Sequence, residues 1–141
     1  MDQVIITYDQ ALDYIYSKID FSLSRQQRYS PEVFNLDRMY SFLRSIGDPQ
    51  NSFRSIHVAG TKGKGSISAM IASVLTTAGY QTGLYSSPHL VDYTERIQID
   101  GTPIQKDEFI SILNRLYPYI EKVKGLTTFE ITTAVAFQYY Q

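Results

Sequence analysis

Apolar residues recur every three or four positions in five segments of the chain, the spacing of one buried face on an α-helix. This pattern predicts helices over about residues 8–19, 36–46, 66–79, 107–123 and 128–141. Thr7 and Gln10 fit a capping box at the start of the first helix, whereas Gly47 and Pro49 end the second. The fourth helix has a clear inner side, made of Phe109, Ile112, Leu113, Leu116 and Ile120.

Three short segments between these helices have the composition or alternation of β-strands: residues 55–59, 82–86 and 95–100. Asp100 and Gly101 signal a tight turn after the third strand. A strand, a glycine-rich loop, a helix and a second strand follow one another over residues 55–86. This order predicts a parallel strand pair with a right-handed crossover, which is an α/β fold.

The last helical pattern is still running at Gln141, and no further strand follows it. Two parallel strands and a short antiparallel piece leave helix faces poorly covered. We therefore expect residues 1–141 to be a truncated α/β unit, the N-terminal portion of a longer domain.

Composition excludes several classes of function. The 141 residues carry a net charge of −1, which gives no electrostatic case for nucleic-acid binding. The chain has no cysteine, so disulfides, thiolate zinc sites and cysteine nucleophiles are excluded. Neither a signal peptide nor a membrane-spanning run is recognisable. We expect a cytoplasmic protein with no membrane partner.

The loop between the first strand and the following helix carries the strongest chemical signal. Its glycines let several backbone N–H groups point at one spot, where the helix adds its positive end and a lysine adds a full charge. The sequence therefore predicts a nucleotide triphosphate site, with a plain turn as the alternative. The predicted ATP-binding residues are Gly60, Thr61, Lys62, Gly63, Lys64, Gly65 and Ser66.

Within this loop, Lys64 is the residue expected to act in catalysis, by contacting the β- and γ-phosphates. Ser66 is expected either to bind phosphate or to cap the helix, and Lys62 either to bind phosphate or to point into water. The loop departs from the usual phosphate-loop consensus, because Gly65 follows Lys64 and the hydroxyl comes one place later.

That departure is similar to the variant loop of the Mur ligase superfamily, and its Gly-Lys-Gly-Ser ending resembles the folylpolyglutamate synthase and dihydrofolate synthase branch. Three further blocks resemble that branch, in the expected order. They are Tyr-Ser-Ser-Pro-His-Leu at 85–90, Tyr-Thr-Glu-Arg-Ile at 93–97 and Leu-Thr-Thr-Phe-Glu at 126–130. The resemblance covers nearly the whole chain and implies a P-loop-type parallel sheet with flanking helices, as in the Mur ligase ATPase domain.

The resemblance also implies a metal site and substrate contacts. It makes Ser87 and Glu130 ligands of Mg²⁺, a hard cation that prefers oxygen. The alternatives are a turn serine and a capping-box glutamate. It implies weaker substrate-side roles for five residues and pterin contacts in the polar stretch 21–34. The five residues are His89, Arg96, Phe137, Gln138 and Tyr139.

For three of those substrate-side assignments the residues themselves leave another reading open. His89 is then a catalytic base or a structural histidine, whereas the resemblance gives it a loop-ordering or substrate-side role. Arg96 forms a surface salt bridge with Glu95, and residues 137–139 belong to the helix core.

The function implied by the resemblance is ATP-dependent amide-bond formation. Mg·ATP phosphorylates the carboxylate of folate or dihydropteroate, and the amino group of L-glutamate attacks the acyl phosphate. The resemblance implies that the rest of the ATP-binding domain and a C-terminal domain lie outside these 141 residues. We therefore expect this portion to be inactive alone and the full-length ligase to be a monomer.

Three alternative functions stay open: a nucleotide-binding fragment without turnover, another Mur-type amide ligase and a phosphate-loop GTPase-like switch. The Asp-x-x-Gly and Asn-Lys-x-Asp motifs of such switches are absent from these residues. The motifs do not separate folylpolyglutamate synthase from the bifunctional dihydrofolate synthase.

Overall fold

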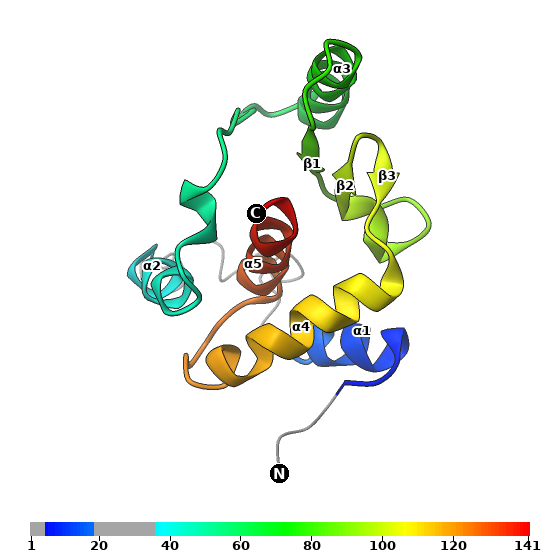
Figure 1. Ribbon diagram of the computed structural model, residues 1–141. Helices are drawn as coiled ribbons and strands as arrows, with labels where there is room; N and C mark the ends of the chain where they lie inside the picture. The colour runs from blue at the N-terminus through cyan, green and yellow to red at the C-terminus, as the bar shows by residue number, and fades with distance from the viewer. Residues whose placement is uncertain (1–4, 19–35) are drawn as a thin grey trace. The chain divides into compact units, whose positions relative to one another are not determined.

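The computed structural model describes residues 5–18 and 36–141 of the chain (Figure 1). The polar stretch 21–34 lies outside the described residues. The chain divides into two compact units. The first comprises Met1–Phe53, Ile110–Tyr139 and Gln141, and the second comprises Arg54–Phe109 and Tyr140.

The first unit is helical. It contains α1 (Tyr8–Tyr16), α2 (Leu36–Ser45), the short 3-10 helix η1 (Pro49–Asn51), most of α4 (Lys106–Ile120) and α5 (Thr128–Tyr140). The predicted capping box at the start of α1 is confirmed, because the Thr7 side chain accepts a hydrogen bond from the Gln10 amide. These helices agree with the predicted segments because their signals are local in the sequence.

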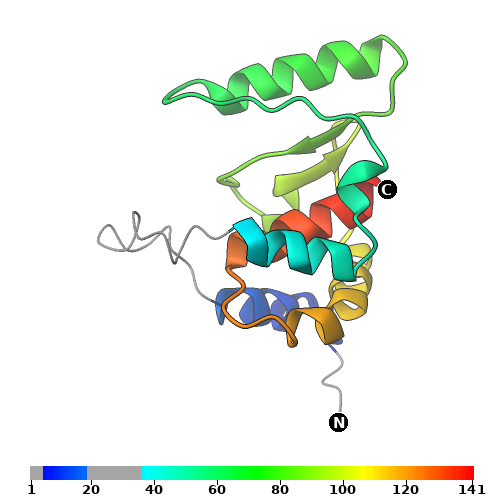
Figure 2. The same cartoon turned by 90° about the vertical axis from the view of Figure 1, so that its left-hand side faces the viewer.

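Helix α5 contacts both α1 and α2 in this unit (Figures 1 and 2). The Thr128 hydroxyl donates to the carbonyl oxygen of Ile15 in α1 at 3.0 Å. The predicted inner side of α4 is confirmed, since all five of its apolar residues are buried. The core of the unit includes Ala11, Ile15, Phe42, Leu43, Ile112, Leu113, Leu116, Ile120, Ile131, Ala134 and Val135.

The second unit contains α3 (Lys64–Thr77), the 3-10 helix η2 (Tyr93–Arg96) and three strands. The strands are β1 (Gly83–Tyr85), β2 (Ile97–Ile99) and β3 (Thr102–Pro103), in the order β1-β2-β3 with both pairs antiparallel (Figure 2). Tyr85 pairs with Ile97, and Ile99 pairs with Thr102. The predicted Asp100–Gly101 turn is confirmed, with φ values of 51° and 76°.

Two strand predictions are wrong in detail. Residues 55–59 form no strand, and the parallel pair expected between 55–59 and 82–86 does not form among the described residues. A strand exists only where a neighbour completes its hydrogen bonds, and here β1 takes β2 as its partner. Glu95 and Arg96, predicted at the start of a strand, lie in η2 instead.

Helix α3 differs from α5 in burial, although both are rich in apolar residues. None of the residues of α3 is buried, and Ile67, Met70 and Val74 are 50%, 67% and 67% exposed. In α5, six residues are buried. The periodicity of α3 therefore predicted the helix correctly, but the described residues leave Ile67, Met70 and Val74 largely exposed and cover Ile71 and Leu75 only in part.

Among the described residues, no helix combines the length and the apolar character that crossing a bilayer requires.

Candidate nucleotide and metal site

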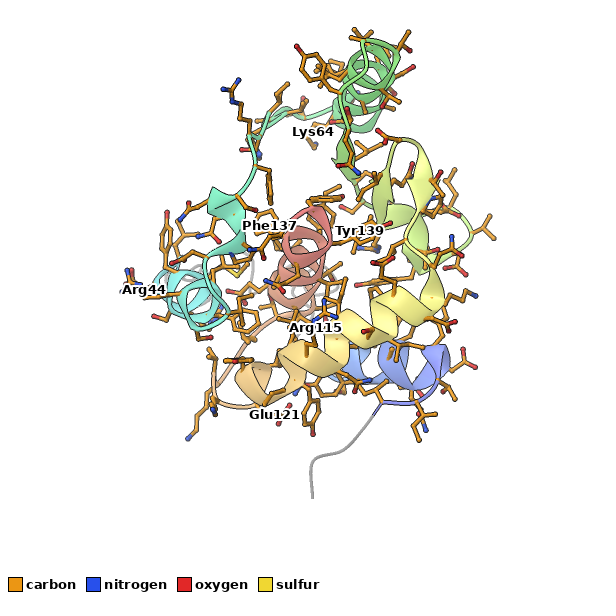
Figure 3. All side chains as sticks on the ribbon, in the orientation of Figure 1. Arg44, Lys64, Arg115, Glu121, Phe137 and Tyr139 are labelled. Atoms are coloured by element: carbon orange, nitrogen blue, oxygen red, sulfur yellow. The ribbon has the colours of Figure 1, made fainter. Side chains whose placement is uncertain are left out.

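The glycine-rich loop curls immediately before α3. Gly63 is the N-cap of the helix and has φ = 76°, a left-handed conformation that glycine adopts without steric cost. The Lys64 ammonium donates a hydrogen bond to the carbonyl oxygen of Gly60 at 2.6 Å. Figure 3 labels Lys64 where the loop enters α3. The positively charged Lys64 ammonium is thus held against the backbone at the start of the loop.

The N-terminus of α3 has the features of an anion-binding site. The first turn contains no acidic residue, and Gly63 has no side chain with which to cap it. The amides of Lys64, Gly65 and Ser66 therefore have no partner within the helix. The capping role considered for Ser66 is wrong, because Ser66 is the third residue of α3 and Gly63 is its N-cap. Thr61 and Lys62 lie in the exposed turn before Gly63.

The segment after β1 carries Ser87 and His89. Ser87 is exposed, and its peptide bond to Pro88 is cis. His89 accepts a hydrogen bond at Nδ1 from Arg96 Nε at 2.8 Å. The Arg96 guanidinium also lies 4.7 Å from the ring centre of Tyr93. This geometry agrees with the loop-ordering interpretation of His89.

Glu95 is engaged by backbone rather than by Arg96. Its carboxylate accepts hydrogen bonds from the amides of Leu90, Val91 and Asp92 at 2.7 to 3.0 Å. These bonds, the one from Leu90 first, hold the pKa of Glu95 below its usual value. The salt bridge considered between Glu95 and Arg96 is therefore wrong.

Sequence reasoning missed the capping box that begins η2. Asp92 accepts from the Thr94 amide at 3.0 Å, and Glu95 returns a bond to the Asp92 amide. The signal was readable, because an aspartate three residues before a glutamate is a known helix-start pattern. It competed with the alternation of residues 95–100, which indicated a strand.

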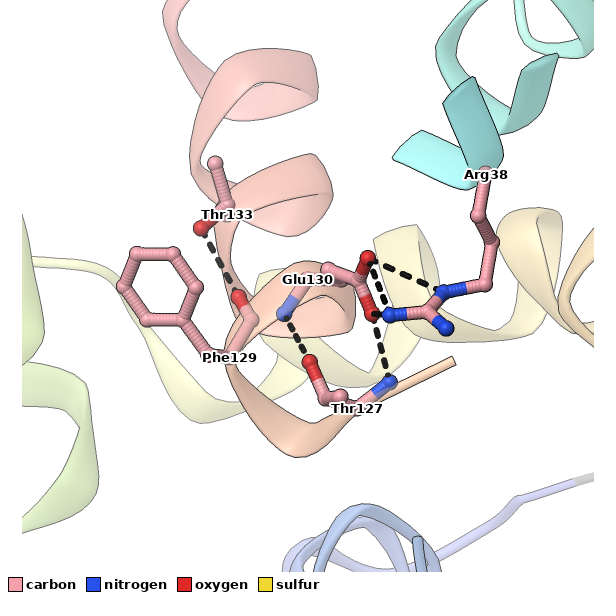
Figure 4. Close-up of polar contacts among 5 residues, drawn as sticks. All are labelled: Arg38, Thr127, Phe129, Glu130 and Thr133. Atoms are coloured by element: carbon pink, nitrogen blue, oxygen red, sulfur yellow. Dashed lines mark hydrogen bonds and ion pairs between the residues drawn. The ribbon is translucent and has the colours of Figure 1, made fainter. Parts of the chain in front are cut away.

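Glu130 lies in the first turn of α5 and is held on both oxygens (Figure 4). Oε1 accepts from Arg38 Nε at 3.1 Å and Nη2 at 3.0 Å, whereas Oε2 accepts from Arg38 Nη2 at 3.0 Å and the Thr127 amide at 2.8 Å. The capping-box interpretation of Glu130 is confirmed, since Thr127 Oγ1 also accepts from the Glu130 amide. Arg38 lies 92 residues before Glu130, and the sequence pattern gave no indication that the two side chains are in contact.

The two predicted metal ligands offer a hydroxyl and a carboxylate, donor types that fit a hard divalent cation. Ser87 belongs to the second unit and Glu130 to the first. Within residues 5–18 and 36–141, no group of three or more histidine, aspartate or glutamate side chains could hold a metal ion. Any cation site built on Glu130 therefore has to draw on the oxygens that Arg38 now contacts.

The predicted substrate residues at the end of α5 make contacts within the first unit. The Phe137 ring centre lies 5.6 Å from that of Phe53, and Gln138 Nε2 lies 3.5 Å from the carbonyl oxygen of Ile46. Figure 3 shows Phe137 and Tyr139 on opposite sides of the helix. All three residues, 137–139, are partly exposed rather than fully buried.

Comparisons with known proteins agree with the motifs. No protein-family model matches the chain. The dihydrofolate synthase/folylpolyglutamate synthase of Bacillus subtilis is 35% identical over 138 residues, which is 94% of this chain and 30% of that protein. The Mycobacterium tuberculosis folylpolyglutamate synthase, solved with ADP and AMPPCP, is 34% identical with a TM-score of 0.73. That match covers 75% of this chain and 26% of that one.

A third match is the bifunctional folylpolyglutamate synthase/dihydrofolate synthase of Yersinia pestis, solved with AMPPNP and a manganese ion. It is 26% identical with a TM-score of 0.79, over 99% of this chain and 32% of that one. The family resemblance read from the motifs is therefore confirmed in sequence and in fold, and with it the α/β class. The chain spans about 30% of the length of the curated relative from Bacillus subtilis.

Proposed function

We propose that this chain, a relative of the folylpolyglutamate and dihydrofolate synthases, supplies the phosphate loop and part of the metal site of an ATP-dependent ligase. The ligase adds L-glutamate to folate or dihydropteroate through an acyl phosphate. The observation that carries the proposal is the Lys64 ammonium held over Gly60 at the start of α3. Residues 1–141 are then the N-terminal portion of its ATP-binding domain.

The loop residues would hold ATP by its phosphates. The first-turn amides of α3 and the Lys64 ammonium offer donors and positive charge to the β- and γ-phosphates. Because phosphoryl transfer needs little covalent help, positioning and charge neutralisation account for most of its catalysis. Relatives solved with ADP, AMPPCP and AMPPNP support this assignment.

Ser87 and Glu130 would hold Mg²⁺ through a hydroxyl and a carboxylate oxygen. A bound divalent cation neutralises charge on the transferring phosphoryl group. The manganese ion in the Yersinia pestis relative supports a divalent cation in this type of site. His89 and Arg96, which order the segment after Ser87, would shape that side of the site, and residues 137–139 would face the pterin. We place the ligase in the cytoplasm, as a monomer.

A second candidate is nucleotide binding without turnover by this chain. The observation that favours it is the exposed apolar side of α3, where Ile67, Met70 and Val74 are at least half exposed in the described residues. In this case the loop binds phosphates, but the chain produces no glutamylated product. The two candidates share the phosphate-binding step and differ only in product formation.

Binding of a fluorescent ATP analogue to the chain tests the shared step. Lys64→Ala removes a charge-assisted contact worth about 1.5–3 kcal/mol, so we expect affinity to fall roughly tenfold to a hundredfold. Lys124→Ala is the matched control, because Lys124 is exposed and outside the loop. Equal affinities for the two variants would refute the phosphate-binding assignment. Both candidates expect no glutamylated product from the chain alone. Product from the full-length protein with Mg·ATP, folate and glutamate would exclude the second candidate.

A further inference from the structure

We propose that Arg38 is a positioning residue that competes with a divalent cation for the carboxylate of Glu130. The inference rests on the proposed role of Glu130 as a metal ligand, and it assigns Arg38 an effect on that ligand. Arg38 lies in the first turns of α2 and Glu130 in the first turn of α5, both within the first unit. Nothing in the motifs singled out Arg38.

The contact is a forked one. Arg38 uses Nε and Nη2 and reaches both Glu130 oxygens at 3.0 to 3.1 Å. A planar guanidinium matches a carboxylate in this way, whereas an ammonium group does not. Side-chain exposure is only 17% for Arg38 and 12% for Glu130, so water screens the pair weakly.

The hydrogen-bonding capacity of the Glu130 carboxylate is filled. An ionised carboxylate has about four acceptor positions. Arg38 occupies two on Oε1 and one on Oε2, and the Thr127 amide takes another on Oε2. A small divalent cation bonds oxygen at about 2.0–2.1 Å and carries a charge that repels the guanidinium. Cation binding by Glu130 therefore requires Arg38 to withdraw from at least one oxygen.

The Thr127 bond gives the carboxylate a fixed orientation that survives such a withdrawal. The bonds between Thr127 and Glu130 lie within the capping box and do not involve Arg38. Arg38 thus sets how readily Glu130 accepts a cation, while the helix cap keeps the carboxylate in place. If the Arg38–Glu130 ion pair served only to hold α2 and α5 together, it would stabilise the unit without changing the affinity of Glu130 for a cation.

Manganese binding to the whole chain separates these two roles. Free Mn²⁺ is followed by electron paramagnetic resonance during titration of the wild type, Arg38→Gln, Glu130→Gln and Arg38→Gln/Glu130→Gln. We expect Arg38→Gln to bind Mn²⁺ about tenfold more tightly than the wild type, because its competing charge is gone. The double variant should lose this gain. Arg44→Gln, on an exposed position of the same helix, should bind like the wild type.

Arg38→Lys guards against loss of the folded state, because it keeps the positive charge and the aliphatic stem but not the fork. It should show a smaller gain than Arg38→Gln. If Arg38→Gln binds Mn²⁺ with the affinity of the wild type, the inference is overturned. Glu130 remains a metal ligand in that case, provided that the double variant binds Mn²⁺ more weakly than Arg38→Gln. If Glu130→Gln changes Mn²⁺ affinity in neither background, the proposed metal role itself fails. Unfolding of both Arg38 variants would make the pair a structural tie and overturn the inference as well.

Discussion

Glu130→Gln is expected to destabilise the first unit, because it removes the carboxylate charge that contacts the Arg38 guanidinium. Both side chains are less than one fifth exposed, and glutamine has nearly the same shape as glutamate. Removing one partner from a fully buried ion pair costs about 3–5 kcal/mol. Because both groups keep some access to water, we expect a loss of about 2 kcal/mol in the free energy of unfolding.

Urea unfolding of the whole chain, followed by far-ultraviolet circular dichroism, measures this loss. Thr127→Ala is the matched control, because it removes the cap at the same helix end and keeps the ion pair. Its expected cost is about 1 kcal/mol. The double variant Arg38→Gln/Glu130→Gln removes both charges. Its loss should be smaller than the sum of the two single losses by about 2 kcal/mol.

Additive losses for Arg38→Gln and Glu130→Gln would refute this reasoning, since the two charges would then contribute independently. A Glu130→Gln loss no larger than that of Thr127→Ala would also refute it. In that case the carboxylate would serve the helix cap alone, and the contacts with Arg38 in Figure 4 would contribute no net stability.

Two further predictions concern sites away from the loop. Hydrogen bonds from Lys18 and Tyr14 lower the pKa of Glu121 in the folded state below its usual value. The ionised Glu121 carboxylate therefore stabilises the fold fully above its unfolded-state pKa, and this stabilisation is lost as the pH falls through its folded-state pKa. Glu121→Gln should therefore lose less stability than the wild type between about pH 6 and pH 3 in urea titrations, and an equally steep loss would contradict this. In Gly83→Ala, the new Cβ would lie 2.8 Å from the Tyr140 ring, so we expect the free energy of unfolding to fall by about 1–3 kcal/mol. Adding Tyr140→Ala should remove this extra loss in urea titrations, and an equal loss from Gly83→Ala in the Tyr140→Ala background would exclude the clash.

The sequence by itself determined the elements whose signals lie within a few residues. The capping boxes at Thr7 and Thr127 formed as the spacing of their side chains predicts. The turn at Asp100 also formed, because its conformation depends on two residues alone. The buried stripe of α4 followed from helical periodicity. The curl of the glycine-rich loop belongs to the same class, since Gly63 and Lys64 are neighbours at one helix start.

The alternation of residues 95–100 shows where a local pattern misled. A strand and a 3-10 turn both fit the residues at 95–96, and the capping bonds of Asp92 and Glu95 decided for the turn. The bonds of Glu95 to three successive amides left Arg96 to contact His89 instead. A charge pattern alone gives the possible partners of an arginine, whereas backbone geometry selects one.

Only the tertiary structure decided which distant groups meet. The strand expected over residues 55–59 needed a neighbour, and β1 pairs with β2 in the described residues. Arg38 contacts Glu130 across 92 residues, because the packing of the first unit brings α2 and α5 together. Strand pairing and buried ion pairs depend on which surfaces are brought into contact, and one-dimensional spacing does not contain that information.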